Sequence, residues 1–215
     1  MKKTIILCLS ILFTICIYAQ KNTSIDTLTC KKIVPGRWAI EIGLGASSNQ
    51  IFKPSYSKNP IATTFNYKIF YRNFFMYVGM NKSFLTPPKD MKFTNIIIKN
   101  QNEVSLTNMN MAIGYMYNFN KKWSADFKLG INSGIVDVLY NNRLKLYSPE
   151  LEVGNSYGIS INRFFKLKRY NYIVLSLGAD YHTTDYSKIS PDMNNQSINY
   201  FLTIAYKGFN KKIMD

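Results

Sequence analysis

Large apolar residues alternate with small or polar ones along "GRWAIEIGLGAS" at 36–47. At the two-residue period of a β-strand, one face carries Trp38, Ile40, Ile42 and Leu44, and the other carries small residues and one glutamate. A half-buried strand of a soluble protein normally shows water a face rich in charged residues, which this segment lacks. The pattern therefore predicts a strand whose apolar face meets lipid.

Seven further segments alternate in the same way and are rich in aromatic residues. The eight predicted strands cover residues 37–47, 62–72, 74–84, 104–119, 123–135, 151–163, 171–183 and 197–207. Each is about ten residues or longer, the length that a tilted transmembrane β-strand needs. Short connections at Asn73, 120–122 and 165–170 alternate with long ones at 48–61, 85–103, 136–150 and 184–196. The pattern predicts an all-β fold, an eight-stranded antiparallel up-and-down transmembrane β-barrel with short periplasmic turns and long external loops.

The two faces of these strands differ consistently. The predicted inner face holds most of the glycines and the polar residues Asn66, Asn81, Asn108, Asn110, Asp126, Asn132, Ser156, Ser160, Ser176 and Asp180. The opposite face is bulky, continuous and almost uncharged. A soluble ligand-binding barrel would place apolar residues inside and charges outside. A soluble periplasmic ligand-binding β-barrel is therefore the less favoured alternative.

The N-terminus predicts export. Lys2 and Lys3 precede an apolar run at 5–18 and a small-residue site at "YAQ", which is a secretory signal pattern. We therefore expect a signal peptide at 1–19, a periplasmic segment at 20–35, the barrel at 36–209 and a periplasmic tail at 210–215. The apolar run is shorter than the roughly 20 residues of a spanning helix.

The exported chain is strongly basic and retains a single thiol. The full sequence has 27 Lys plus Arg and 12 Asp plus Glu, and loss of Lys2 and Lys3 leaves 25 basic residues. Cys30 remains alone after cleavage, which excludes intramolecular disulfides. Export and the lack of any nucleic-acid-binding motif argue against nucleic acid as a partner, despite the positive charge.

Aromatic and basic residues gather where the predicted strands meet the short turns. The predicted aromatic girdle consists of Trp38, Tyr71, Phe74, Tyr117, Phe119, Trp123 and Tyr206. Beside it lie many of the lysines and arginines, which form a periplasmic basic collar. This collar either contacts anionic lipid headgroups or is a solvated rim.

The charged residues of the inner face predict a filled lumen. Glu41 lies on the first strand between Lys68 of the second strand and Lys207 of the last, because barrel closure pairs the first and last strands. Asp126 and Lys128 also face inward. Since the interior of an eight-stranded barrel is just wide enough for side chains, we expect these five residues to form an ion-pair network. A narrow porin-like channel is the alternative.

Few residues point to catalysis. His182 is the only histidine, and a lipid-modifying enzyme of the outer membrane would need such a base, with Thr184, Asp180 or Asp185 nearby. The spacing matches no nucleophile and base pair, so we expect no catalytic residues. No cluster of ligands suggests a metal and no motif suggests a cofactor.

One external loop contains a hairpin pattern. The stretch "GIVDVLYNNRLKLYSPE" alternates on both sides of Asn141 and Asn142, a pair suited to a tight turn. We therefore expect Tyr140, Asn141, Asn142 and Arg143 to form an exposed hairpin, whose edge offers a site for strand addition by a partner. A loop without regular structure is the alternative.

The chain resembles the small eight-stranded outer-membrane barrels of the OmpA transmembrane-domain and OmpX type, and the outer membrane beta-barrel proteins of Bacteroidota. The resemblance rests on the signal ending "YAQ", the first strand "WAIEIGLGAS" and the last strand "INYFLTIAYKGF". It implies location in the cell outer membrane, with membrane lipid and the barrel-insertion machinery as partners. We expect a monomer with a structural or surface-interaction role, through a surface or periplasmic protein partner.

Overall fold

Eight long antiparallel strands build the protein in the computed structural model, which describes residues 33–51, 53, 61–85, 90–93, 96–98, 103–140, 143–145, 152–168 and 170–213. The barrel strands are β1 (Ile33–Asn49), β2 (Ile61–Tyr71), β3 (Phe74–Leu85), β6 (Glu103–Asn118), β7 (Trp123–Tyr140), β9 (Glu152–Lys168), β10 (Asn171–His182) and β11 (Ser197–Ile213). The loops carry β4 (Met91–Phe93), β5 (Ile96–Ile98), β8 (Arg143–Lys145) and the short 3-10 helix η2 (Tyr186–Lys188).

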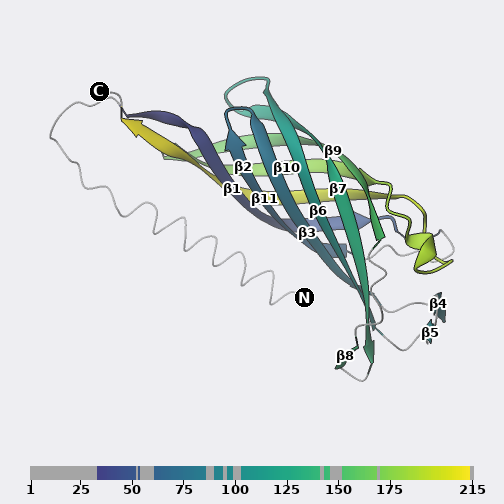
Figure 1. Cartoon of the computed structure of the whole chain (residues 1–215). Coiled ribbons are helices and arrows are strands. Elements are labelled where there is room, and N and C mark those ends of the chain that lie inside the picture. Colours follow the sequence, from purple (N-terminus) through teal and green to yellow (C-terminus); the bar gives the residue numbers. More distant parts are fainter. Residues whose placement is uncertain are drawn as a thin grey trace. The chain divides into compact units, whose positions relative to one another are not determined.

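Each barrel strand pairs with its neighbours along the chain. The sheet runs in the order β6-β3-β2-β1-β11-β10-β9-β7-β8, and a further pairing of β6 with β7 closes it (Figure 1). Residues 34–212 form this one compact unit. The predicted all-β, eight-stranded antiparallel up-and-down barrel is thereby confirmed. No helix in the described ranges is long and apolar enough to cross a membrane.

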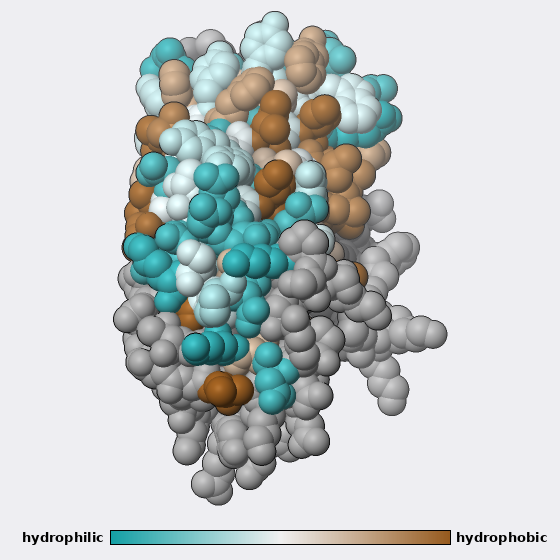
Figure 2. Space-filling model, turned by 90° about the vertical axis from the view of Figure 1, so that its right-hand side faces the viewer, coloured by the Kyte–Doolittle hydropathy of each residue, from teal (hydrophilic) through white to brown (hydrophobic). Residues whose placement is uncertain are grey.

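The two faces of the wall are those expected from the sequence. In β2, buried Thr64, Asn66 and Lys68 alternate with outward residues such as Phe65. The remaining strands repeat this pattern, and every polar residue assigned to the inner face is buried. Hydrophobic side chains gather over the barrel wall, and hydrophilic ones gather around the loop end near η2 (Figure 2). The outside of the barrel is therefore suited to lipid, and its inside is polar.

Several strands are longer than predicted. The strand β9 continues to Lys168, so the predicted six-residue connection at 165–170 is wrong, and the register shifts between Asn171 and Tyr172. The strand β11 continues to Ile213, beyond the predicted barrel boundary at 209. Alternation of apolar and polar residues marks only the part of a strand that separates lipid from lumen. Backbone pairing between strands continues beyond this part, so the strands are longer than the alternating segments.

Some expectations lie outside the described residues. They are the signal peptide at 1–19, residues 20–32 of the N-terminal segment with Cys30, the turn residues Asn141 and Asn142, and residues 214–215 of the tail.

Candidate functional site

The middle of the lumen is occupied by a layer of ion pairs. The ammonium nitrogen of Lys68 lies 2.9 Å from Glu41 Oε1 and 2.7 Å from Asp126 Oδ2. Lys207 Nζ lies 3.7 Å from Glu41 Oε2. These four side chains project from β1, β2, β7 and β11, and all are almost completely buried. The structure therefore brings together four of the five residues that were expected to pair.

The fifth residue, Lys128, pairs with Asp180, which was expected on the inner face but not as the partner of Lys128. Its ammonium nitrogen lies 3.0 Å from Asp180 Oδ1 and 3.8 Å from the centre of the Tyr77 ring. Gly158 is the strand neighbour of both Lys128 and Asp180. A Cβ at Gly158 would overlap both side chains. Because Gly158 has no side chain, it leaves the space in which Lys128 and Asp180 meet.

The charges of the layer cancel. Glu41, Asp126 and Asp180 face Lys68, Lys128 and Lys207, so three carboxylates meet three ammonium groups. Burying an unpaired charge costs several kcal/mol, whereas a paired one loses much less. A balanced set therefore avoids the cost of an unpaired charge in a narrow lumen.

On the side of the short turns, the lumen is filled by aromatic and aliphatic side chains. The buried cluster comprises Ala39, Phe70, Phe75, Tyr77, Ala112 and Met116, with Phe164 and Phe209 packed against it. Lys207 Nζ lies 3.3 Å from the centre of the Phe70 ring. This apolar layer closes the barrel directly below the ion pairs.

On the side of the loops, the lumen is polar and uncharged. Asn132 Nδ2 donates to the hydroxyl of Thr184 at 2.9 Å, and Asn110 Nδ2 donates to Ser156 Oγ at 2.9 Å. Several other buried polar atoms have no protein partner within the described residues, among them atoms of Ser47, Asn49, Thr64, Asn81, His182, Ser197 and Asn199. Since buried polar groups are normally hydrogen-bonded, we expect ordered water in this part of the lumen.

His182 lies in this polar region, and no described nucleophilic side chain is hydrogen-bonded to it. The imidazole is 1% exposed, and neither ring nitrogen has a hydrogen-bond partner among the described side chains. Thr184 is engaged with Asn132, Asp180 pairs with Lys128, and Asp185 accepts from Ser187. The residues that a lipid-modifying enzyme would require are therefore near in sequence but occupied elsewhere.

A cap built by three loops and the loop ends of β6 and β7 covers the polar region. Its buried residues are Ile51, Met91, Val104, Leu106, Val136, Tyr186 and Met193. Three loops are joined by hydrogen bonds, for example from Asn194 N to Ile51 O at 2.7 Å and from Ser190 Oγ to Lys92 O at 2.7 Å. This cap was not predicted from the sequence. Its only signal was the presence of isolated apolar residues in otherwise polar loops.

Tyr186 connects the cap to the barrel wall. Its hydroxyl donates to Asn108 Oδ1 and accepts from Asn132 Nδ2, the latter at 3.2 Å. Burial raises the pKa of the Tyr186 phenol to about 12. The apolar cap thus covers the loop end of the lumen, and the hydrogen bonds of the Tyr186 hydroxyl attach it to the barrel wall.

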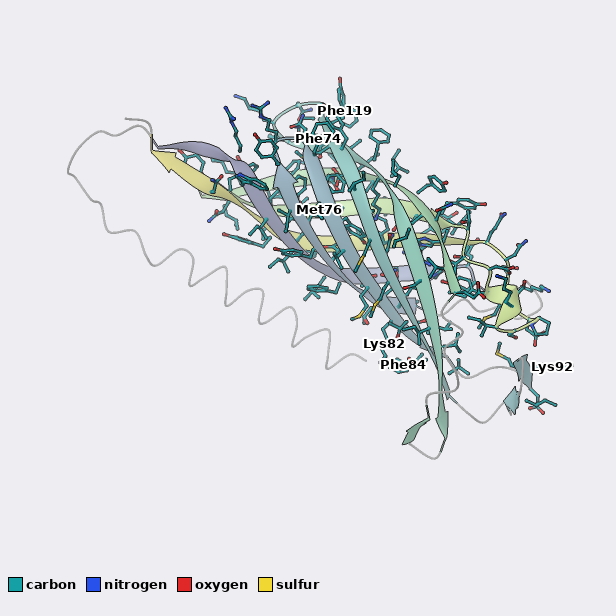
Figure 3. The ribbon with its side chains drawn as sticks, viewed as in Figure 1. Phe74, Met76, Lys82, Phe84, Lys92 and Phe119 are labelled. Carbon is teal, nitrogen blue, oxygen red and sulfur yellow. The ribbon has the colours of Figure 1, made fainter. Side chains whose placement is uncertain are left out.

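The predicted girdle residues lie outside the barrel. All seven are between 36% and 65% exposed, which is unusual for such large apolar side chains in water. Trp38 contacts Tyr71 with ring centroids 4.9 Å apart, and Tyr117 contacts Phe119 at 5.4 Å. Phe74 and Phe119 lie at the end with short turns, whereas Lys82 and Phe84 lie toward the loops (Figure 3).

The structure also contains a pair of strands at the predicted hairpin. The strand β7 pairs with β8, with Tyr140 opposite Arg143 and Leu139 opposite Leu144. Because β7 pairs with β9 only from Trp123 to Gly134, its last residues project together with β8 beyond the loop end of the barrel (Figure 1).

Solved structures of the same architecture identify the fold. The chain superposes on Ail, the attachment invasion locus protein of Yersinia pestis solved with the heparin analogue sucrose octasulfate, with a TM-score of 0.51, 13% identity and coverage of 81% of this chain and 99% of Ail. For Neisserial surface protein A the TM-score is 0.50, with 6% identity, 83% of this chain and 99% of that one. The fold is that of small outer-membrane β-barrels.

Sequence comparisons do not assign the chain to a protein family. No family model matches the chain, and no curated protein matches it. The outer-membrane location that the sequence predicts agrees with the barrel fold and with its apolar outer face. Within the described ranges, no group of three or more His, Cys, Asp or Glu side chains is placed to hold a metal ion.

Proposed function

We propose that the protein is an outer-membrane barrel that acts through its surface and conducts no solutes. The observation that carries this proposal is that protein side chains occupy the lumen at three levels, namely the apolar cluster around Phe70 and Phe75, the ion pairs around Lys68, and the cap around Tyr186, with the polar region between the last two. Each layer uses side chains from opposite sides of the barrel. A barrel filled in this way leaves its loops and rims as the parts that meet other molecules.

The projecting hairpin is the surface feature that best fits a protein partner. The strand β8 is the last strand in the order of the described sheet, so one edge faces away from β7. In a hairpin with a two-residue turn, Tyr140 and Arg143 exchange backbone hydrogen bonds, and the N–H and C=O of Leu144 point outward. An extended segment of a partner can pair with such an edge. Ail, a barrel of the same fold, is named for attachment and invasion, which supports a role in surface contacts.

A proline at position 144 tests strand addition. Leu144→Pro removes the outward N–H and leaves the hydrogen bonds between β7 and β8 intact, because those bonds involve Tyr140 and Arg143. With a photo-cross-linking amino acid at position 145 in cells that naturally make the protein, we expect one discrete adduct with a partner protein. The adduct should disappear with Leu144→Pro.

The matched control is Leu144→Ala, which changes the same side chain and keeps the N–H. The adduct should persist in that variant. Absence of any adduct in the unaltered background, or an adduct of equal strength with proline, would exclude partner binding through this edge.

A further inference from the structure

The end of the barrel with short turns carries a dense positive charge with no carboxylate beside it among the described residues. The basic residues of this collar with described side chains are Arg37, Arg72, Lys121, Lys122, Arg163 and Lys166. Five of them are exposed and one, Arg163, is half-buried. The Asp and Glu side chains that the structure describes lie elsewhere: Glu41, Asp126 and Asp180 in the lumen, and Asp90, Glu152, Asp185 and Asp192 toward the loops. The backbone places residues 103 and 137 at the loop end as well. The collar therefore finds no neutralising carboxylate in the described part of the chain, and its natural counterpart is an external anion.

The arginines of the collar are built into the aromatic girdle. The guanidinium carbon of Arg163 lies 4.8 Å from the centre of the Trp123 ring and 5.4 Å from that of Phe165. The guanidinium of Arg72 lies 5.7 Å from the Tyr71 ring. Trp123, Phe165 and Tyr71 are exposed on the lipid-facing side of the wall. Such contacts place each cation at the level where an apolar surface meets the polar headgroups.

The turn between β2 and β3 presents Arg72 in a fixed position. Arg72 adopts a φ of 56°, a left-handed conformation that is uncommon for residues other than glycine. Its amide donates to the carbonyl oxygen of Arg37 at 2.7 Å, which joins two members of the collar. The backbone thus holds these two cations side by side at the rim of the barrel.

From this arrangement we propose that the collar is a binding surface for anionic phospholipid headgroups, such as those of phosphatidylglycerol, in the membrane leaflet next to the short turns. Guanidinium groups bind phosphate through paired hydrogen bonds, and lysines add charge. The interleaved aromatic side chains favour a lipid over a soluble acidic protein, because the same residues that hold the arginines also contact acyl chains. This surface is separate from the β8 edge and lies at the opposite end of the strands.

The two tryptophans of the chain, Trp38 and Trp123, both lie beside the collar and report on the lipids around it. The unaltered protein is reconstituted in vesicles that contain equal amounts of phosphatidylcholine and phosphatidylglycerol. In one preparation the phosphatidylcholine carries bromine on its acyl chains, and in the other the phosphatidylglycerol does. Brominated phosphatidylglycerol should quench tryptophan fluorescence more strongly than its mole fraction predicts. Added salt should weaken this preference, since salt screens exposed charges.

Two matched double variants locate the preference. The variant Lys121→Gln/Lys122→Gln leaves the stacked arginines unchanged. Its preference for phosphatidylglycerol should fall by about fivefold or more, because one cation near an anionic surface contributes about 1 kcal/mol, which corresponds to that factor. In Lys82→Gln/Lys92→Gln, at the loop end, the preference should remain. Slower migration after boiling, measured for each variant, verifies that the barrel is folded.

Equal quenching by both brominated lipids in the unaltered protein would overturn the proposal, and so would a preference that is independent of salt. A preference that survives in the collar variant, or that is lost equally in the loop-end variant, would also contradict it. If the collar served an acidic protein instead, the two lipids would quench equally. None of these results depends on the cross-linking at the β8 edge.

Discussion

Replacing Lys68 with methionine is expected to lower the free energy of unfolding of the barrel by about 3–5 kcal/mol, because loss of one partner leaves buried charges uncompensated. Methionine fills similar space but carries no charge. Asp126 then loses the ammonium nitrogen 2.7 Å away, and Glu41 retains only Lys207 at 3.7 Å. Urea titration of the refolded barrel in detergent micelles, followed by tryptophan fluorescence, measures the change.

A second variant and a control make this test specific. In Lys68→Met/Asp126→Asn, two carboxylates again face two ammonium groups, so we expect recovery of more than half of the lost stability. Lys92→Met removes an exposed lysine at the loop end and should change stability by no more than about 0.5 kcal/mol. Equal stability of Lys68→Met and the unaltered protein would show that the lumen charges are hydrated rather than paired.

A second large effect is expected at Gly45, where β1 approaches the backbone of β11. A Cβ at this position would overlap the carbonyl oxygen of Leu202 and lie 2.7 Å from the Cα of Thr203. Since these neighbours are backbone atoms of the next strand, they move only if the strand pair shifts. Gly45→Ala should therefore destabilise the barrel by about 1–3 kcal/mol or more, and Gly45→Leu should prevent closure, which the same titration and the mobility shift on boiling detect.

Gly208 provides the matched control for a glycine in the same strand pair. An added Cβ there lies 3.4 Å from its nearest neighbour, a carbon of the Tyr206 ring, which is an ordinary contact distance. Gly208→Ala should therefore leave stability within about 0.5 kcal/mol. If Gly45→Ala is tolerated as well as Gly208→Ala, the close approach of β1 and β11 is not a requirement of the fold.

The wall of the barrel was predictable because lipid and lumen impose opposite chemistry on alternate residues. The pairing of Glu41 with Lys68 and Lys207 followed from two facts, their common inward parity and the closure of the first strand on the last. Both facts are visible in the sequence once the strands are counted. The outward girdle around Trp38 and Trp123 followed in the same way.

The partner of Lys128 was harder to predict, because it depends on the register across three strands. Asp180 was correctly placed on the inner face, but only the pairing of Lys128 and Asp180 with the same residue, Gly158, brings them together. Register is set by the turns, and the turn between β9 and β10 is shorter than the sequence pattern suggested. One misplaced turn is sufficient to hide such a contact.

The cap was not predictable from local patterns. Ile51, Met91 and Met193 are isolated apolar residues in three different loops, and no periodicity links them. They meet because the barrel holds the ends of the loops close together above a polar lumen. Long-range packing of this kind leaves no regular signal in a single sequence.

Electrical recording from planar bilayers that contain the purified, folded protein tests the sealed lumen most directly. The filling of the lumen by the cluster around Phe70, the ion pairs of Lys68 and the cap around Tyr186 predicts a baseline without discrete conductance steps. As a positive control, a known open porin in the same bilayers should give clear steps. Reproducible steps from the unaltered protein, abolished or resized by Glu41→Gln or Lys68→Met, would contradict the account and make this barrel a narrow channel.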